Sequence, residues 1–493
     1  MSIANALNNA LSGLRANGRQ ADVTAGNLAN ALTPGYGRQE VDLVSAVSGG
    51  QGTGVKVAGI TRVLDIELSS ARRMADGELA DATAKADALR KLETEFGSLG
   101  GVPGLAARLA SFEGALRDLA ETPENAPAQV SAAEAASDLA LAFNELSRSL
   151  TDLRAETDRE IGRVVSETNT ALERIAQLNR DIQLGEATGR NSAALIDARE
   201  REIDVVARAV PIRRSERADG VVELTTREGI GLVDIRAYRI DYAVTPVYAP
   251  GLSYDGGSGP LSGLSLRGLD ITPGGPGPQQ VRGGALAGLF SVRDAIAPEA
   301  EAQFDSLAAD LITRLADPAI DPTLAPGDPG LFTDGGSAFD LANIEGIAGR
   351  IGLNAAVDPR QGGEPAKLRD GINAAAPGPS GNDDLVRAMS DALSASTDAA
   401  APPATPGLSG NLSLAERLDG VAELLGGARV VAEAAQTRAG AGREALANEE
   451  ATELGVDSDR ELSRLVEIEQ AYAANAQVIQ VAARMLDELR RIQ

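Results

Sequence analysis

The C-terminal stretch from Ser458 to Ile492 carries the pattern that most constrains how this chain can fold. Read in heptads, it repeats apolar residues along one side, in three sets: Leu465, Tyr472, Ile479 and Leu486; Ile468, Asn475, Ala482 and Leu489; and Ala471, Val478, Met485 and Ile492. This spacing predicts an amphipathic helix with a broad apolar stripe. Such a helix is only marginally stable alone, so the stripe needs a partner.

The beginning of the chain carries a matching stripe. Residues 2–32 are expected to form a helix whose apolar residues recur at steps of three, four or seven, namely Ala4, Leu7, Leu11, Leu14, Ala21, Ala25 and Leu28. We interpret the two ends as one antiparallel helical pair into which the rest of the chain is inserted. Either the pair docks on the core of its own domain, or it packs between the subunits of an assembly.

The second alternative predicts an assembly interface made by both ends of the chain. Asn475 lies on the stripe, where it either fixes the register of the helices or sits at the rim of a tilted contact. Tyr36 and Tyr472 anchor either a contact between subunits or the chain's own core. The predicted interface residues are Leu7, Leu11, Leu14, Leu28, Tyr36, Leu465, Ile468, Tyr472, Asn475, Ile479, Leu486 and Leu489.

Composition narrows the chemistry open to the chain. It has 493 residues, which suggests two to four domains, and it contains no cysteine and no histidine. The absence of histidine removes the commonest general base and metal ligand. It argues against zinc, copper and catalytic-triad chemistry, whereas metal sites made by Asp and Glu and catalysis by carboxylates remain open on composition. We expect no catalytic residues, no metal site and no cofactor.

Charge and hydropathy limit which classes of partner the chain can have. The formal net charge is −25, with no concentrated basic stripe, which argues against nucleic acid and anionic membranes as partners. The N-terminus does not read as a cleaved signal peptide, and no run of about 20 apolar residues could span a bilayer.

The order of elements predicts a mainly α fold with an inserted β-rich domain. We expect an elongated molecule: N- and C-terminal helices paired as a coiled coil, a helical-bundle stem and a mid-chain β knob. The third stem helix should run from about Pro127 to Leu184, with a slip in its stripe between Leu153 and Ile161. The expected domains are a terminal domain of residues 1–60 and 440–493, a stem of residues 61–210 and 281–439 with irregular segments at 317–380, and a β-rich domain of residues 211–280.

Turn and break signals complete this outline. Residues 41–63 alternate loosely and should form short extended pieces, residues 396–411 should be a linker, and a break at Gly455 should separate the last helix from the one before it.

Motifs at both ends resemble those of the flagellar rod, hook and hook-associated proteins. The N-terminal motif is NLANALTPGYGRQ at residues 27–39, and the C-terminal motifs are GVDSDREL at 455–462, EQAYAANA at 469–476 and MLD at 485–487. Internal motifs are similar to those of the hook-associated members; these are LNRDI at 178–182, LIDARE at 195–200, GGALAGLF at 283–290, Arg293-Asp294 and QFDSLA at 303–308. Glu200 departs from the pattern, which usually has aspartate there.

The resemblance implies a structural protein without enzymatic activity. A hook-associated member would form the junction between hook and filament, with its terminal helices in the inner tube, and would permit filament assembly. It would contact copies of itself, the hook protein, the next hook-associated protein and an export chaperone that binds the C-terminal region. It would be secreted by the flagellar type III apparatus and reside in the extracellular flagellum.

Two other functions remain open. One is the hook protein or another axial protein of the same family. The other, from a different class, is an exported carboxylate-dependent hydrolase of cell-wall glycan, which needs two facing carboxylates. Nothing in the sequence singles out such a pair among its 71 acidic residues.

Overall fold

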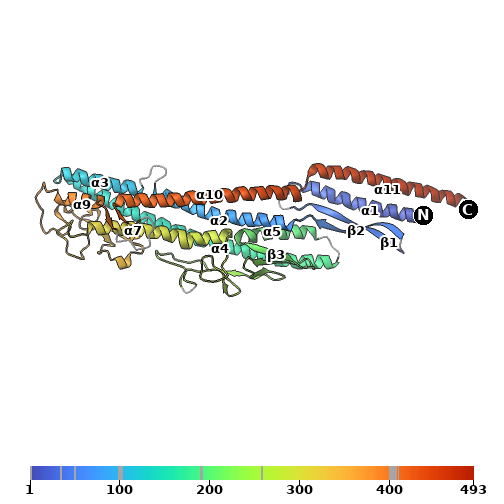
Figure 1. Ribbon diagram of the computed structural model, residues 1–493, viewed down its shortest axis with the longest axis horizontal. Helices are drawn as coiled ribbons and strands as arrows, with labels where there is room; N and C mark the ends of the chain where they lie inside the picture. The colour runs from blue at the N-terminus through green and yellow to red at the C-terminus, as the bar shows by residue number, and fades with distance from the viewer. Residues whose placement is uncertain are drawn as a thin grey trace.

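The chain folds into a long, narrow molecule with both termini at one end (Figure 1). The computed structural model describes residues 3–33, 36–48, 51–97, 104–188, 192–256, 259–398, 408 and 410–492. Helices dominate, and the small sheets lie mostly in the middle of the sequence, so the predicted mainly α fold with an inserted β-rich part is confirmed.

The terminal end consists of two helices and a hairpin. Helix α1 (Ile3–Ala29) packs against α11 (Ser458–Ile492), and the two run antiparallel along the free end of the molecule (Figure 1). Strands β1 (Gln39–Ser48) and β2 (Gln51–Arg62) pair antiparallel and also pack on α1. The helical pairing agrees with the sequence-based prediction; supercoiling of the pair stays a prediction.

The hairpin is longer than the short extended pieces expected for residues 41–63. Its pairing shifts register between Asp42 and Leu43 and again between Ala46 and Val47. These irregularities break the strict alternation that marks a strand in sequence.

The stem is built from helices packed lengthwise. α10 (Leu414–Leu454) runs along α2 (Ile66–Phe96), and α4 (Ala126–Thr188) packs against α3 (Leu105–Glu121), α5 (Ala193–Ala209) and α7 (Ala297–Leu315). α6 (Gly284–Ser291) joins α7 through a π-helical turn at Val292–Ile296. The predicted break is also present, since α10 ends at Leu454 and α11 begins at Ser458.

Short strands and turns complete the chain. β3 (Ile212–Glu216), β4 (Val222–Thr226) and β5 (Gly231–Val233) form one sheet, and β6 (Ile240–Asp241), β7 (Ser265–Leu266) and β8 (Leu269–Asp270) form another. The remaining elements are β9 (Phe332–Asp334) paired with β10 (Ile351–Leu353), β11 (Thr397–Asp398) paired with β12 (Asn411–Leu412), α8 (Lys367–Asp370), α9 (Asp384–Ser394) and 3-10 turns at Leu341–Asn343, Ile347–Gly349 and Pro359–Gln361. The expected linker at 396–411 lies largely outside the described residues.

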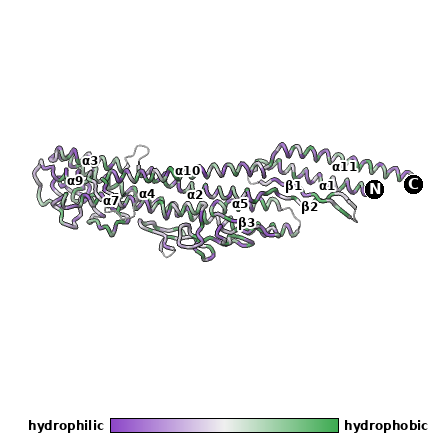
Figure 2. The backbone as a smooth tube through the Cα atoms, in the orientation of Figure 1, coloured by the Kyte–Doolittle hydropathy of each residue, from purple (hydrophilic) through white to green (hydrophobic). Residues whose placement is uncertain are grey.

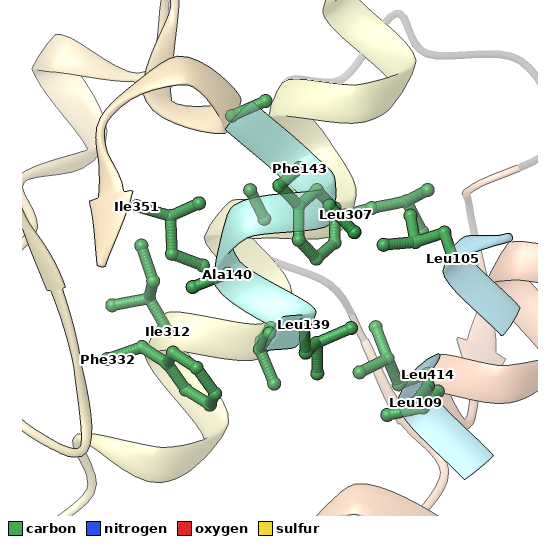
Figure 3. Packing of buried hydrophobic residues seen from close by; sticks show 14 of the residues in the cluster. Leu105, Leu109, Leu139, Ala140, Phe143, Leu307, Ile312, Phe332, Ile351 and Leu414 are labelled. Carbon is green, nitrogen blue, oxygen red and sulfur yellow. The ribbon is translucent and has the colours of Figure 1, made fainter. Parts of the chain in front are cut away.

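Two apolar cores hold the stem together. The first lies at the end away from the termini, where Leu139 and Phe143 of α4 pack between α3 and the β9–β10 region (Figure 3). The second joins the later part of α4, including Ile161 and Leu172, to α5 and the small sheets. The stripe predicted on the third stem helix therefore faces both cores.

The slip in that stripe is filled by buried polar groups. Arg154, Thr157 and Asp158 are all buried between Leu153 and Ile161. Asp158 accepts hydrogen bonds from the hydroxyls of Tyr242 (2.5 Å) and Tyr248 (3.1 Å), from Arg293 Nη1 (2.8 Å) and from the Thr245 N–H (2.7 Å). The slip therefore marks one of the points where α4 is hydrogen-bonded to the β-rich part, and Asn169 and Asn179 form others.

Candidate assembly interface

The contact between α1 and α11 includes a close approach at Gly13. A Cβ at this position would lie 2.7 Å from Asn475 Nδ2, so the missing side chain makes room for α11. Ile468 and Ala482, one heptad on either side of Asn475, are buried. Asn475 thus faces α1 of its own chain, and its role in fixing the register stays a prediction.

The structure divides the twelve predicted interface residues into three groups. Ile468 is buried. The half-buried residues are Leu7, Leu14, Leu28, Tyr36, Leu465, Asn475 and Ile479. The exposed residues are Leu11, Tyr472, Leu486 and Leu489. The pair therefore covers part of the predicted surface within one chain, and contacts of the rest with other subunits stay a prediction.

A second apolar stripe runs along the exposed side of α11. Val478, Val481, Met485 and Leu489 follow one another at steps of three and four residues, which places them on one helix face. Their exposed fractions are 43%, 46%, 51% and 53%, respectively. Figure 2 shows apolar and polar residues alternating along α11 toward the C-terminus. The heptad analysis omitted Val481, which the same spacing could have identified.

Exposed apolar residues also occur on the hairpin, which packs on α1 as α11 does. Leu43, Val44 and Val47 of β1 are exposed. The terminal end thus carries apolar side chains on α11 and on β1 that the described residues leave exposed. Uncovered apolar surface of this kind is typical of a protein–protein contact.

The N-terminal motif joins the end of α1 to the start of the hairpin. Asn27 is buried; its Nδ2 donates to the Gln39 carbonyl (2.9 Å), and its Oδ1 accepts from the Gln39 N–H (3.0 Å) and the Tyr36 hydroxyl (2.9 Å). Burial, followed by the charges of Asp197 and Glu461, raises the pKa of Tyr36. The motif residues Pro34 and Gly35 lie outside the described residues.

Asp197 connects this terminal end to the stem. Its Oδ1 accepts from Arg62 Nε (2.5 Å) and from the Gly37 N–H (3.3 Å). Burial raises the pKa of Asp197, although the Arg62 guanidinium acts in the opposite direction. The internal motif at 195–200 therefore meets the end of β2 and the turn after α1.

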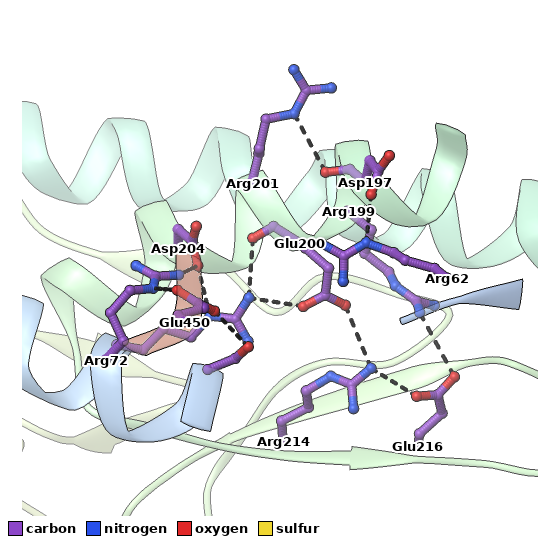
Figure 4. Close-up of polar contacts among 12 residues, drawn as sticks. Arg62, Arg72, Asp197, Arg199, Glu200, Arg201, Asp204, Arg214, Glu216 and Glu450 are labelled. Atoms are coloured by element: carbon purple, nitrogen blue, oxygen red, sulfur yellow. Dashed lines mark hydrogen bonds and ion pairs between the residues drawn. The ribbon is translucent and has the colours of Figure 1, made fainter. Parts of the chain in front are cut away.

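A network of ion pairs surrounds the same junction (Figure 4). Arg72 binds Asp204 (2.7 Å) and Glu450 (2.5 Å), which links α2 to α5 and to the end of α10. Glu200 pairs with Arg73 (2.8 Å) and Arg214 (3.4 Å). Burial alone would raise the pKa of Glu200, but these two guanidinium groups outweigh it and lower the pKa. Glutamate at this position thus bridges two arginines.

Two structural features are absent from the described residues. These residues contain no group of three or more acidic side chains placed to hold a metal ion. None of the helices they form combines the length and apolarity needed to cross a bilayer.

Comparison with known proteins gives matches to the stem and to the last helix. Residues 89–317 match the model described as the flagellar hook-associated protein FlgK helical domain. Residues 453–492 match the model described as the flagellar basal body rod FlgEFG protein C-terminal. The second match contains α11 and its uncovered stripe.

Curated relatives carry the name flagellar hook-associated protein 1. The protein from Bacillus subtilis is 31% identical over 224 residues, which are 43% of this chain and 44% of that protein. The protein from Escherichia coli is 25% identical over 234 residues, which are 46% of this chain and 42% of that protein. Each match thus spans less than half of the relative's length.

One solved structure, that of the flagellar hook junction protein FlgK from Burkholderia pseudomallei, is also similar. The likeness covers 54% of this chain and 47% of the other, with 18% sequence identity and a TM-score of 0.43. The residues matched by the two family models contain the internal motifs at 178–182, 195–200, 283–290 and 303–308 and the C-terminal motifs at 455–462, 469–476 and 485–487. The stem of this chain is therefore similar to the helical domain of flagellar hook-associated protein 1, and its last helix to the C-terminal region of flagellar rod proteins.

Proposed function

We propose that this protein is a structural subunit of the bacterial flagellum that forms the junction between hook and filament and permits the filament to grow. The observation that carries this proposal is the uncovered apolar stripe of α11, formed by Val478, Val481, Met485 and Leu489. At about 1.5–3 kcal/mol for each fully buried aliphatic side chain, covering this stripe would stabilise an assembly substantially.

The arrangement of the chain supports such a role. Both termini lie at one end, and the stem extends far from them (Figure 1). Stacking many copies by their terminal ends would place the stems side by side around a tube. Such an arrangement buries the apolar surface of each copy against its neighbours.

The proposed partners follow from this position. They are further copies of this chain, the hook protein on one side and the next hook-associated protein on the other. We also propose secretion through the flagellar type III apparatus, with a chaperone bound to the C-terminal region. The role requires no catalytic step, and we propose that the protein is not an enzyme.

Deletion of the gene tests this function. We expect cells with hooks but no filaments, and filament subunits released into the medium. Electron microscopy of the cells and immunoblots of the medium measure both outcomes. Restoring the gene should restore the filaments. Normal filaments in the deletion strain would contradict the junction role, and absent hooks would assign the chain to an earlier step of assembly.

A further inference from the structure

A pocket lined by arginines lies beside the junction between the terminal end and the stem. It has a volume of about 330 Å³ and lies between α2, the end of α5 and strand β3. Its basic residues are Arg73, Arg213, Arg214 and Arg227, and none of its described lining residues is acidic.

Two of these arginines are fixed in place. Arg73 is held by Glu200 and Asp204, and Arg214 is held by Glu200 and Glu216. The Arg214 side chain is only 4% exposed, yet its Nε has no hydrogen-bond partner among the described residues. A buried guanidinium N–H without a partner is costly unless a ligand or an ordered water supplies an acceptor.

The other two arginines are free to bind an anion. Arg213 and Arg227 are exposed, and neither side chain forms an ion pair or hydrogen bond within the part of the chain that the structure describes. Arg213 follows Ile212 on β3, and Arg227 directly follows β4. They therefore present two unneutralised charges at the pocket, next to two guanidinium groups that are already positioned.

The rest of the lining favours a particular kind of anion. Met74, Ala207 and Ile212 supply apolar surface beside the guanidinium groups. A glutamate side chain has an aliphatic stem that can contact such surface and a carboxylate that accepts paired N–H bonds. Inorganic phosphate offers only the acceptors.

We infer that this pocket binds an acidic side chain of a second copy of this chain. Each copy carries 71 acidic and 46 basic residues, so copies packed side by side repel one another unless local contacts compensate. An arginine pocket on so acidic a chain offers complementary charge to the surface of its neighbour. This inference rests on the proposed function, which requires copies to associate.

Binding by the purified full-length protein tests the chemistry. Titration calorimetry compares acetylated tetraglutamate, acetylated tetraglutamine and inorganic phosphate, each at low and high salt. We expect the glutamate peptide to bind, with affinity that falls as salt rises, and the glutamine peptide not to bind. Arg213→Gln with Arg227→Gln should weaken the binding at least tenfold. Phosphate binding without peptide binding would overturn the inference, as would unchanged binding by the double variant.

A matched control separates the pocket from overall charge. Arg148 and Arg236 are exposed and form no side-chain ion pair within the described residues, so Arg148→Gln with Arg236→Gln changes the net charge equally. We expect this control to bind the peptide as the wild type does. Circular dichroism of both double variants checks that they fold.

Cross-linking in assembled flagella tests whether a second copy of this chain supplies the acidic side chain. A photoreactive amino acid at position 213 should cross-link to another copy of this chain, at a segment that contains Asp or Glu. Cross-linking to a different protein, or none, would overturn the inference. The proposed function has its own readout, because the deletion strain would still lack filaments if the pocket had no role.

Discussion

Asp158 holds the β-rich part of the molecule on the stem. It is fully buried and accepts bonds from two tyrosines, a backbone N–H and Arg293. Arg293 also pairs with Asp294 at 2.7 Å, so it would keep one carboxylate without Asp158. Removing one partner of such a buried ion pair strongly destabilises a protein, because the charge of the other partner stays buried without compensation.

We expect Asp158→Asn to destabilise the protein by about 3 kcal/mol, the lower end for a broken buried pair because Asp294 remains. The measurement is the shift of the urea midpoint, followed by circular dichroism. Asp152→Asn is the control, since Asp152 is an exposed residue of the same helix. Equal midpoints for the two variants would contradict the role assigned to Asp158.

Asp305 gives a prediction about pH. Burial raises the pKa of its carboxyl to about 7, although the N–H groups of Ala348 and Gly346 donate to it. Glu301 also raises this pKa, and Arg350 lowers it. Between about pH 4 and pH 7, the folded state therefore keeps this carboxyl protonated, whereas the unfolded state, with an ordinary pKa near 4, has lost the proton.

The sign of the effect follows directly from this difference. As pH rises from about 4 to about 7, the wild type should lose stability relative to Asp305→Asn, and the gap should stop changing above that range. Asparagine loses an acceptor, so the variant can be less stable overall, but it does not titrate. Urea midpoints of both proteins across this pH range measure the gap. A gap independent of pH would show that the carboxyl is not perturbed.

At the scale of elements, repeated apolar spacing was the reliable signal in the sequence. The stripe of α4 from Leu139 to Ile182 predicted a long helix because every turn repeats the same requirement for burial. The slip after Leu153 could be seen in the sequence, but the buried polar residues that occupy it could not be predicted. From the sequence alone, Arg154 and Asp158 would be assigned to the surface. Their burial depends on ion pairs with Glu301 and Arg293, which lie far away in the sequence.

The hairpin and the arginine pocket were harder to predict for related reasons. The hairpin's apolar residues Leu43, Val44 and Val47 are exposed and its pairing is interrupted, so its strands lack the usual alternation. The pocket joins residues of α2 to residues of β3 that lie far apart in sequence. In contrast, most of the predicted interface residues follow from heptads alone, apart from Tyr36, which lies beyond α1.

The two glycines of α1 give a matched test of the helical pair. A Cβ at Gly13 would crowd Asn475, whereas a Cβ at Gly18 would meet nothing within 4 Å. Alanine favours a helix over glycine by about 1 kcal/mol. We expect Gly18→Ala to stabilise the α1–α11 pair. Gly13→Ala should stabilise the pair less, or destabilise it, because Asn475 must move to make room for the new Cβ.

Hydrogen exchange of the α11 amides measures this difference in the purified protein. Adding Asn475→Ala to Gly13→Ala should remove the crowding and restore protection to that of Gly18→Ala or more. Equal protection in Gly13→Ala and Gly18→Ala would show that α11 does not approach α1 at this point.

At the scale of the whole molecule, the apolar stripe and the charge have opposite effects on association. A formal net charge of −25 keeps separate copies apart, while the uncovered stripe of α11 favours contact between them. Contact therefore has to be concentrated where apolar surface is dense, and the terminal end is such a place.

Val481→Glu tests whether this stripe is the contact. Val481 is 46% exposed and lies between Val478 and Met485, so glutamate there should leave the folded chain intact yet place a charge in the proposed interface. We expect the purified variant to unfold at the same temperature as the wild type, and cells to secrete it normally. The number of filaments per cell should fall at least tenfold, because burying an unpaired carboxylate costs several kcal/mol. Val247→Glu is the matched control, since Val247 is 74% exposed and lies in the β-rich part, away from the terminal end. Filaments lost equally in both variants would indicate a general effect of charge, and filaments kept in Val481→Glu would mean that this face of α11 remains in contact with solvent in the flagellum.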